Sequence, residues 1–146
     1  MKVLSKSSEY GLRALLYMAG KSGDQQEYVN IREMSEQLDI SFHFLTKILQ
    51  SLTQANLLVS YRGPSGGVAF LIPPNEILLS DVVRTLEGED FFETCLLGLP
   101  GCGEKRPCPM HQFWATIRGD LKEEFESTSI ASMAQDAKMK QLRLMP

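Results

Sequence analysis

Residues 30–52 contain two short amphipathic segments separated by a tight turn, and a chain with this pattern has few ways to fold. Asn30 is a suitable helix cap with Glu33 three residues later, and Ser41 is a suitable cap for the second segment. The apolar residues recur at helical spacing in both segments: Ile31, Met34 and Leu38, then Leu45, Ile48, Leu49 and Leu52. Two short helices joined at residues 39 and 40 are the layout of a helix-turn-helix.

A hairpin is predicted directly after these helices. Two strand-like runs, 57–61 and 68–72, flank a turn that contains Gly63, Gly66 and Gly67. Glycine adopts the positive φ angles that a hairpin tip requires. The sequence therefore predicts a wing behind the helix-turn-helix, and a mainly α fold with a small β wing (α+β).

Two further helices are predicted around this unit. Before it, apolar residues at positions 12, 15, 16 and 19 mark a helix that starts near Ser8, and Gly20 with residues 22–24 is expected to end it. After it, two prolines stop the second strand, Ser80 is the expected cap of a helix over 81–87, and Gly88 closes that helix.

Composition and charge narrow the class of protein. The chain has 146 residues, 43% of them hydrophobic and 23% charged, and its apolar runs are far shorter than the roughly 20 residues that span a bilayer. A membrane protein is excluded, and without a cleavable leader we expect a cytoplasmic protein. The net charge is -3, with 7 basic against 6 acidic residues up to residue 72 and 8 against 12 afterwards. Binding to nucleic acid therefore depends on where the cations lie.

The outward face of the second short helix carries polar side chains that hydrogen-bond base edges or phosphates. Arg62, beside flexible glycines, suits a narrow minor groove. A solvated helix face and a plain hairpin turn are the alternative interpretation. The residues predicted to contact double-stranded DNA are Ser41, His43, Lys47 and Gln50 on the helix, and Arg62, Gly63, Ser65 and Gly66 on the wing.

Three cysteines lie in a loop at 89–109 that has no hydrophobic period. Cys95, Cys102 and Cys108 are followed by His111, which places three thiols and an imidazole within seventeen residues. Thiolates favour iron-sulfur clusters, copper(I) or zinc, and the paired C-x2–4-C knuckles of structural zinc sites are missing. The spacing favours a cluster over zinc, and unligated or redox-sensitive thiols remain the alternative.

The C-terminal part predicts a helix with a large apolar stripe. Its members are Met110, Phe113, Trp114, Ile117, Leu121 and Phe125. We expect Phe113, Trp114, Ile117, Leu121 and Phe125 to form a two-fold dimer, which would match a palindromic operator. The tail is expected to be mobile apart from a short helix around 130–134. The predicted division is 1–74 for the winged domain, 75–109 for the connecting helix and sensor loop, and 110–146 for the dimer helix and tail.

The chain offers little for catalysis, because its two histidines lie on the predicted DNA-facing helix and beside the cysteines. We expect no enzyme. A redox or electron-transfer protein without DNA is the competing class, but such a protein has no use for Arg62 on a glycine-rich hairpin.

Three motifs together resemble the Rrf2 family of bacterial transcription regulators. They are SEYGLRALLYMA at 8–19, VSYRGPSGG at 59–67, and the three-cysteine loop. The resemblance implies a homodimeric winged-helix regulator in which Cys95, Cys102 and Cys108 hold an iron-sulfur cluster that tunes DNA affinity. Cluster-free regulators that sense thiol oxidation, or that bind zinc, are the alternative within the same fold.

The resemblance offers two fourth ligands. His111 matches the ligand of the [2Fe-2S] iron-sulfur biogenesis regulators, while Glu9 lies where the nitric-oxide sensors have an aspartate ligand to a [4Fe-4S] cluster, donated as Glu9 of the partner subunit. We prefer His111 and a [2Fe-2S] cluster; a helix N-terminal acid and a helix cap are the plainer roles of Glu9 and His111. The chain departs from the family in its longer first cysteine gap and in His43-Phe44.

Overall fold

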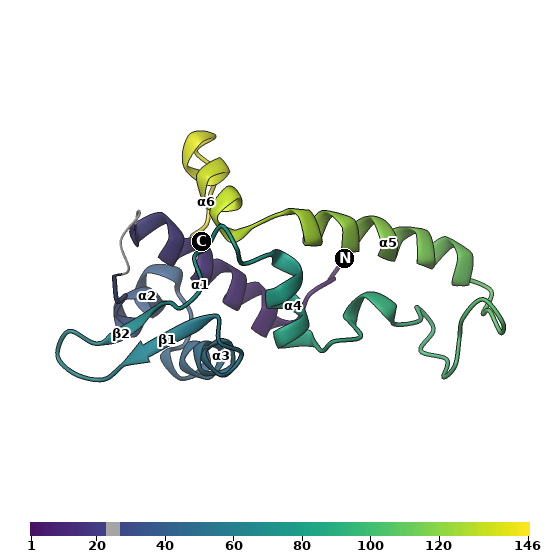
Figure 1. The fold of residues 1–146 in the computed structure, drawn as a ribbon, viewed down its shortest axis with the longest axis horizontal. Helices are drawn as coiled ribbons and strands as arrows, with labels where there is room; N and C mark the ends of the chain where they lie inside the picture. The colour runs from purple at the N-terminus through teal and green to yellow at the C-terminus, as the bar shows by residue number, and fades with distance from the viewer. Residues whose placement is uncertain (23–26) are drawn as a thin grey trace.

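The computed structural model describes residues 1–22 and 27–146. Within these residues the elements in chain order are α1 Lys6–Ser22, α2 Ile31–Leu38, α3 Phe42–Gln54, β1 Leu58–Tyr61, β2 Gly67–Phe70, α4 Leu79–Glu87, the 3-10 helix η1 Phe91–Glu93, α5 His111–Ser127 and α6 Ile130–Met139. The predicted mainly α fold with a small β wing is confirmed (Figure 1). None of the helices described is both long and apolar enough to cross a bilayer.

Helix α1 forms the centre of the winged domain. It contacts α3, α4 and α6, and its side chains Ala14, Leu15 and Met18 are fully buried. A Cβ at Gly11 would lie 2.6 Å from Cδ1 of Leu86, so α1 and α4 approach closely there. The helix begins earlier than predicted and continues through Gly20; the stop expected at residues 23 and 24 lies outside the described residues.

The helix-turn-helix forms as predicted, because its caps act locally. The Asn30 side chain accepts the Glu33 backbone N–H at 2.9 Å, and the Ser41 hydroxyl accepts that of Phe44 at 3.4 Å. Asp39 adopts the left-handed conformation (φ 54°) that turns the chain between α2 and α3. The inward residues of α3 are all buried: Leu45, Ile48, Leu49 and Leu52.

The wing is an antiparallel pair in which Leu58 faces Phe70 and Tyr61 faces Gly67. Its strands are shorter than the predicted runs. Val29, just before α2, exchanges two backbone hydrogen bonds with Val68, at 2.7 and 3.0 Å, and thereby ties the wing to the helix-turn-helix.

Two expectations for the later helices were wrong. Helix α4 begins at Leu79, so Ser80 is buried inside its first turn and is not its cap; instead the Leu78 backbone N–H donates to Oδ2 of Asp81 at 2.9 Å. The C-terminal helix does not end near 134 but runs to Met139, and Ile130 is buried in the core against α1. The chain therefore leaves the winged domain through η1 and the cysteine loop, and it returns along α5 to α6 (Figure 1).

Candidate DNA interface and cysteine centre

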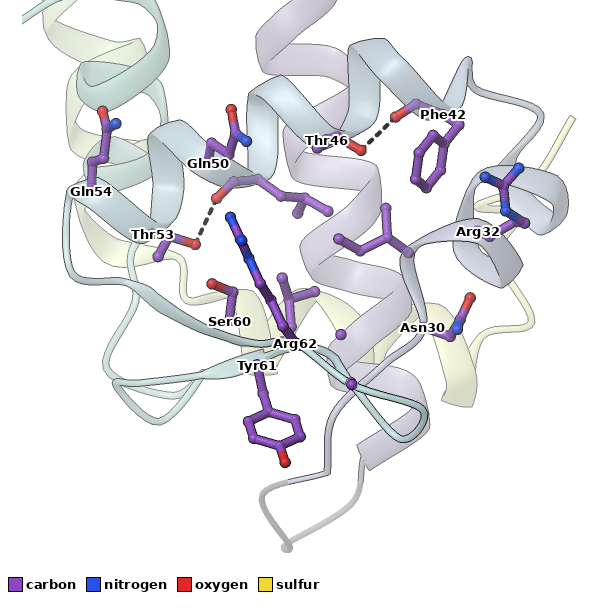
Figure 2. A pocket seen from close by; sticks show the side chains of 16 residues that line it. Asn30, Arg32, Phe42, Thr46, Gln50, Thr53, Gln54, Ser60, Tyr61 and Arg62 are labelled. Atoms are coloured by element: carbon purple, nitrogen blue, oxygen red, sulfur yellow. Dashed lines mark hydrogen bonds between the residues drawn. The ribbon is translucent and has the colours of Figure 1, made fainter.

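A groove of about 850 Å³ lies between α3 and the wing, and we call it the α3–wing groove (Figure 2). Its polar lining includes Gln50, Thr53 and Gln54 on α3, Arg62 on the wing and Arg32 on α2. No acidic side chain is among its lining residues, although the whole chain is acidic. Cations gathered without acids in a groove bordered by a recognition helix favour a polyanion.

Arg62 is the cation that the wing contributes to this groove. It follows β1 directly, at the base of the turn, and its side chain extends from the wing toward α3 (Figure 2). No described residue makes a hydrogen bond or ion pair with its guanidinium. Its donors are therefore available to a bound ligand.

The residues predicted to contact DNA fall into two groups. Gln50, Arg62, Gly63 and Gly66 line the groove. The other four lie outside it: Ser41 caps α3, His43 is exposed on its first turn, Lys47 borders a small hollow with Ser7 and Thr85, and Ser65 borders another hollow beside Tyr28.

The sequence did not predict a cation–π pair between Arg32 and Phe42, which is the first residue of α3. The Arg32 guanidinium lies 4.2 Å from the centroid of the Phe42 ring, and both residues line the α3–wing groove. Arg32 occupies the first turn of α2, where the helix dipole disfavours a cation, and that position was the available clue. A guanidinium over an aromatic ring is held in place by the cation–π attraction.

The three cysteines converge, and we call them the cysteine centre. Their Sγ atoms all lie within 4.8 Å of one another, and the Cys95 and Cys108 Sγ atoms are 3.7 Å apart. The Cys108 backbone N–H donates to the Cys102 Sγ at 3.4 Å. All three are free thiols and partly buried. A loop without a hydrophobic core therefore brings three soft donors to one point.

The surroundings of Cys95 and Cys102 shift the pKa values of their thiols in opposite directions. The backbone N–H of Leu99 is the main cause that lowers the pKa of Cys95 to about 7. The pKa of Cys102 is also lowered by the Cys108 N–H, but burial and the two neighbouring thiols outweigh this and raise it overall. The centre thus offers one thiolate readily near neutral pH.

The two candidate fourth ligands differ in their position within the protomer. His111, the first residue of α5, has its Nδ1 3.5 Å from the Cys102 Sγ. Glu9 lies in the first turn of α1 and forms an ion pair with Lys6 at 3.2 Å.

The apolar stripe of α5 divides between two surfaces. Phe113 is 60% exposed and Ile117 39% exposed, whereas Trp114, Leu121 and Phe125 are partly covered by their own chain. The Trp114 indole N–H donates to the Thr94 carbonyl at 2.9 Å. The Phe125 ring meets the buried Phe92 at 5.8 Å. Only part of the predicted dimer stripe is therefore open in the single protomer.

A helix-turn-helix with a cation in the groove beside its wing defines a winged-helix DNA-binding protein. Residues 4–136 match the model of the Rrf2 family, described as an iron-dependent transcriptional regulator, so the chain belongs to the Rrf2 family. The family consists of transcription regulators and not of enzymes.

Individual relatives agree with this assignment. A putative HTH-type transcriptional regulator of Aquifex aeolicus is 26% identical over 133 residues, 90% of each chain. The HTH-type transcriptional regulator NsrR of Oceanobacillus iheyensis is 36% identical over 92 residues, 63% of this chain and 61% of that one.

Solved structures share the fold. CymR (YrzC), the global cysteine regulator of B. subtilis, superposes with a TM-score of 0.75 at 26% identity, over 92% of this chain and 98% of that one. IscR of T. potens gives a TM-score of 0.76 at 24% identity, over 98% and 93% of the two chains, and at this identity the likeness concerns the fold alone.

Proposed function

We propose that this Rrf2 regulator binds a palindromic operator as a homodimer and that an iron-sulfur cluster in the cysteine centre switches its affinity for DNA. The observation that carries the proposal is the convergence of three Sγ atoms within 4.8 Å on the loop of a winged-helix chain. The proposed setting is the reducing cytoplasm, where thiols remain available to a metal.

The α3–wing groove supports a defined mode of DNA binding. Helix α3 lies in the major groove with Gln50 toward the base edges, and Arg62 reaches the adjacent minor groove. Arg32, held by Phe42, binds the phosphate backbone beside the entrance of α3. His43, Lys47, Ser41 and Ser65 contribute contacts at the edge of this surface.

The donor set fits an iron-sulfur cluster, since three thiols and an imidazole are ligands such clusters accept. Cys95, Cys102 and Cys108 would hold it, and His111 is the preferred fourth ligand because its Nδ1 already lies beside Cys102. A [2Fe-2S] cluster follows from that choice; Glu9 of the partner subunit with a [4Fe-4S] cluster is the alternative. When bound, the group supplies a centre sensitive to redox state, nitric oxide or iron supply.

The position of the cysteines supports a route by which the loop would affect DNA binding. Cys95 follows η1, which contacts α4, while Cys108 and His111 stand at the start of α5. A ligand set that joins these residues ties the winged domain to α5. In a dimer through Phe113 and Ile117, that tie sets the spacing of the two α3 helices.

Anaerobic purification followed by visible absorption and by iron and sulfide analysis tests the proposal. We expect a visible chromophore, stoichiometric iron and sulfide, and an operator affinity that differs between cluster-loaded and cluster-free protein by 5-fold to 150-fold, about 1–3 kcal/mol. Zinc or no metal in anaerobic protein, with the affinity of a cysteine-free variant, would contradict it.

The Cys95 and Cys108 thiols favour a second candidate, a cluster-free thiol switch. With Sγ atoms 3.7 Å apart, one peroxide molecule could oxidise the pair to a disulfide and be reduced to two waters. Mass spectrometry of metal-free protein treated with peroxide, with and without a reductant, distinguishes this switch from the cluster.

A further inference from the structure

The carbonyl oxygen of Thr94 accepts hydrogen bonds from two side chains of α5. The Trp114 indole Nε1 donates to it at 2.9 Å and the Arg118 Nη1 at 3.4 Å. Trp114 and Arg118 are one helical turn apart, so they project from the same side of α5. Thr94 is the residue directly before Cys95, and we call this arrangement the Thr94 clamp.

The clamp is an unusual feature of α5. No residue of the helix is fully buried, yet the Nε of Arg118 is shielded from solvent and has no hydrogen-bond partner among the described residues. Shielding a guanidinium donor in this way costs free energy, and an apolar side chain would fill the same space without that cost. Placement of the Thr94 backbone offsets the cost, because a charged donor with a fixed planar shape orients a carbonyl well.

The segment before the clamp is held from the other side. The Phe92 ring contacts both the Arg84 guanidinium, 5.1 Å from its centroid, and the Phe125 ring, whose centroid is 5.8 Å away. Arg84 also forms an ion pair with Glu126 of α5 at 2.9 Å. Cys95 therefore follows a stretch that is fixed to both α4 and α5.

Among the described residues, the other two cysteines contact α5 only at its first residue, His111. The Cys102 Sγ lies 3.5 Å from the Nδ1 of His111, and the His111 backbone N–H donates to the Cys108 carbonyl at 3.1 Å. Other hydrogen bonds of this segment stay within the loop, as in the turns closed by Gly98 to Cys95 and by Cys102 to Leu99. Cys95 is thus attached through Thr94 to the second and third turns of α5, whereas Cys102 and Cys108 adjoin the first residue of that helix.

We propose that Trp114 and Arg118 are positioning residues for the cysteine centre: through the Thr94 carbonyl they set the place of Cys95 on α5 and couple the state of the loop to that helix. This inference rests on the proposed function. It adds the contact through which the state of the cysteine centre would reach α5. It also removes Trp114 from the dimer stripe and assigns it to the sensor loop.

The test uses the full-length protein and four variants. Arg118→Met removes the donors and keeps the length of the side chain, Arg118→Lys keeps a charge, and Trp114→Phe keeps the ring and removes the N–H. Arg143→Met, on the exposed C-terminal tail, is the matched control. Circular dichroism checks that each variant is folded.

The first readout needs no metal. Trp114 is the single tryptophan of the chain, so its fluorescence reports on the clamp alone. In reduced, metal-free protein we expect acrylamide to quench this fluorescence about twice as efficiently in Arg118→Met as in wild type, because the indole loses its neighbour on the shared carbonyl. Arg118→Lys should be intermediate, and Arg143→Met should equal the wild type.

The second readout is the ratio of operator affinities with and without a cluster reconstituted from ferrous iron and sulfide. Arg118→Met and Trp114→Phe should reduce this ratio at least threefold, whereas the affinity of the metal-free protein should change by less than about twofold. If both variants keep the same affinity ratio as the wild type, or if quenching in Arg118→Met is unchanged, the role of the Thr94 clamp is overturned but the proposed function is not. A wild-type ratio of one would overturn the proposed function itself, whatever the variants do.

Discussion

Arg62 has no ion-pair or hydrogen-bond partner for its guanidinium among residues 1–22 and 27–146, and it lines a groove whose described lining holds no acid. It is therefore the first residue to test in the proposed DNA interface. Replacing Arg62 by alanine should weaken operator binding by about 1–3 kcal/mol if the guanidinium reads a groove. Lys47→Ala, which lies outside the groove, should instead reduce the slope of log affinity against log salt by about 1. Fluorescence anisotropy titrations over a salt series measure both effects. Unchanged binding in both variants would remove this surface from the proposed interface.

Gly67 is required where the wing meets the residue before α2. It has φ +152°, and a Cβ there would lie 2.0 Å from the Val29 carbonyl oxygen. Gly67→Ala should therefore destabilise the fold by about 1–3 kcal/mol, through backbone strain and loss of the contact with Val29. Urea unfolding followed by circular dichroism measures this.

Gly20 provides the control for Gly67. It is an exposed helical position where an added Cβ meets nothing within 4 Å. Gly20→Ala should leave stability unchanged or raise it by up to about 1 kcal/mol. Equal effects of the two substitutions would contradict the role of Gly67.

At the scale of elements, Glu87 joins the end of α4 to the start of α1. Its Oε1 accepts the Ser5 backbone N–H and the Ser8 hydroxyl, each at 2.7 Å. Burial raises the pKa of this carboxyl, but the hydrogen bonds from Ser5 and Ser8 outweigh burial and lower the pKa from its usual value. A lowered pKa in the folded state stabilises the fold above the unfolded pKa, and this contribution is lost as pH falls through the folded pKa.

Glu87→Gln should therefore cost about 1–2 kcal/mol of stability at pH 7, where the wild-type carboxylate accepts two charge-assisted hydrogen bonds. The difference between the two proteins should shrink as the pH falls below the ordinary carboxyl range, because the wild-type group becomes protonated there. Urea denaturation of both proteins between pH 7 and pH 3 measures the trend. A difference that does not depend on pH would show that the charge of Glu87 has no part in joining the helices.

Helix α5 presents Phe113 and Ile117 to solvent in the single protomer, and an apolar pair on a projecting helix favours a dimer contact. Ile117→Glu should convert the dimer to a monomer and reduce operator affinity by 100-fold or more, on the order of the avidity that a second linked half-site adds. Sedimentation velocity and anisotropy measure these. Gln112→Glu, on a different side of α5, should change neither, and a monomeric wild type would contradict the model.

At the scale of the whole molecule, the cysteine centre and α3 are separate sites that are connected through α4, η1 and α5. Serine at any one of Cys95, Cys102 and Cys108 should abolish the visible chromophore, because a hydroxyl replaces a thiolate ligand poorly. These variants should bind the operator as the metal-free wild type does. A chromophore that survives in all three would exclude the cysteine centre as its site.

The fourth ligand can be identified in the same assay. His111→Ala should shift or remove the visible spectrum if His111 is the ligand, and Glu9→Ala should do so if Glu9 of the partner subunit is the ligand. We expect the effect in His111→Ala, because its Nδ1 lies beside Cys102. Loss in neither variant would indicate an exogenous ligand.

The helix-turn-helix, the wing and the presence of a cysteine site were predictable because their determinants lie close together in the chain. Asn30 and Ser41 cap helices through residues three positions away, and the inward residues of α3 follow from helical spacing. The misplaced cap of α4 was also a local choice, but it depended on burial: Ser80 is an adequate cap by type, and packing of α4 against α1 draws it into the helix.

Contacts between distant residues were beyond the reach of such reasoning. The stacking of Arg32 on Phe42, the bond from Trp114 to Thr94 and the burial of Ile130 against α1 join positions about 10 to over 100 residues apart. Spacing predicted that α5 has an apolar stripe. It could not predict which of those side chains are covered by their own chain, because that depends on where η1 and the cysteine loop fold back. Local hydrogen bonding and periodicity thus fixed which helices and turns form, whereas burial between elements decided which of their side chains remain free to bind.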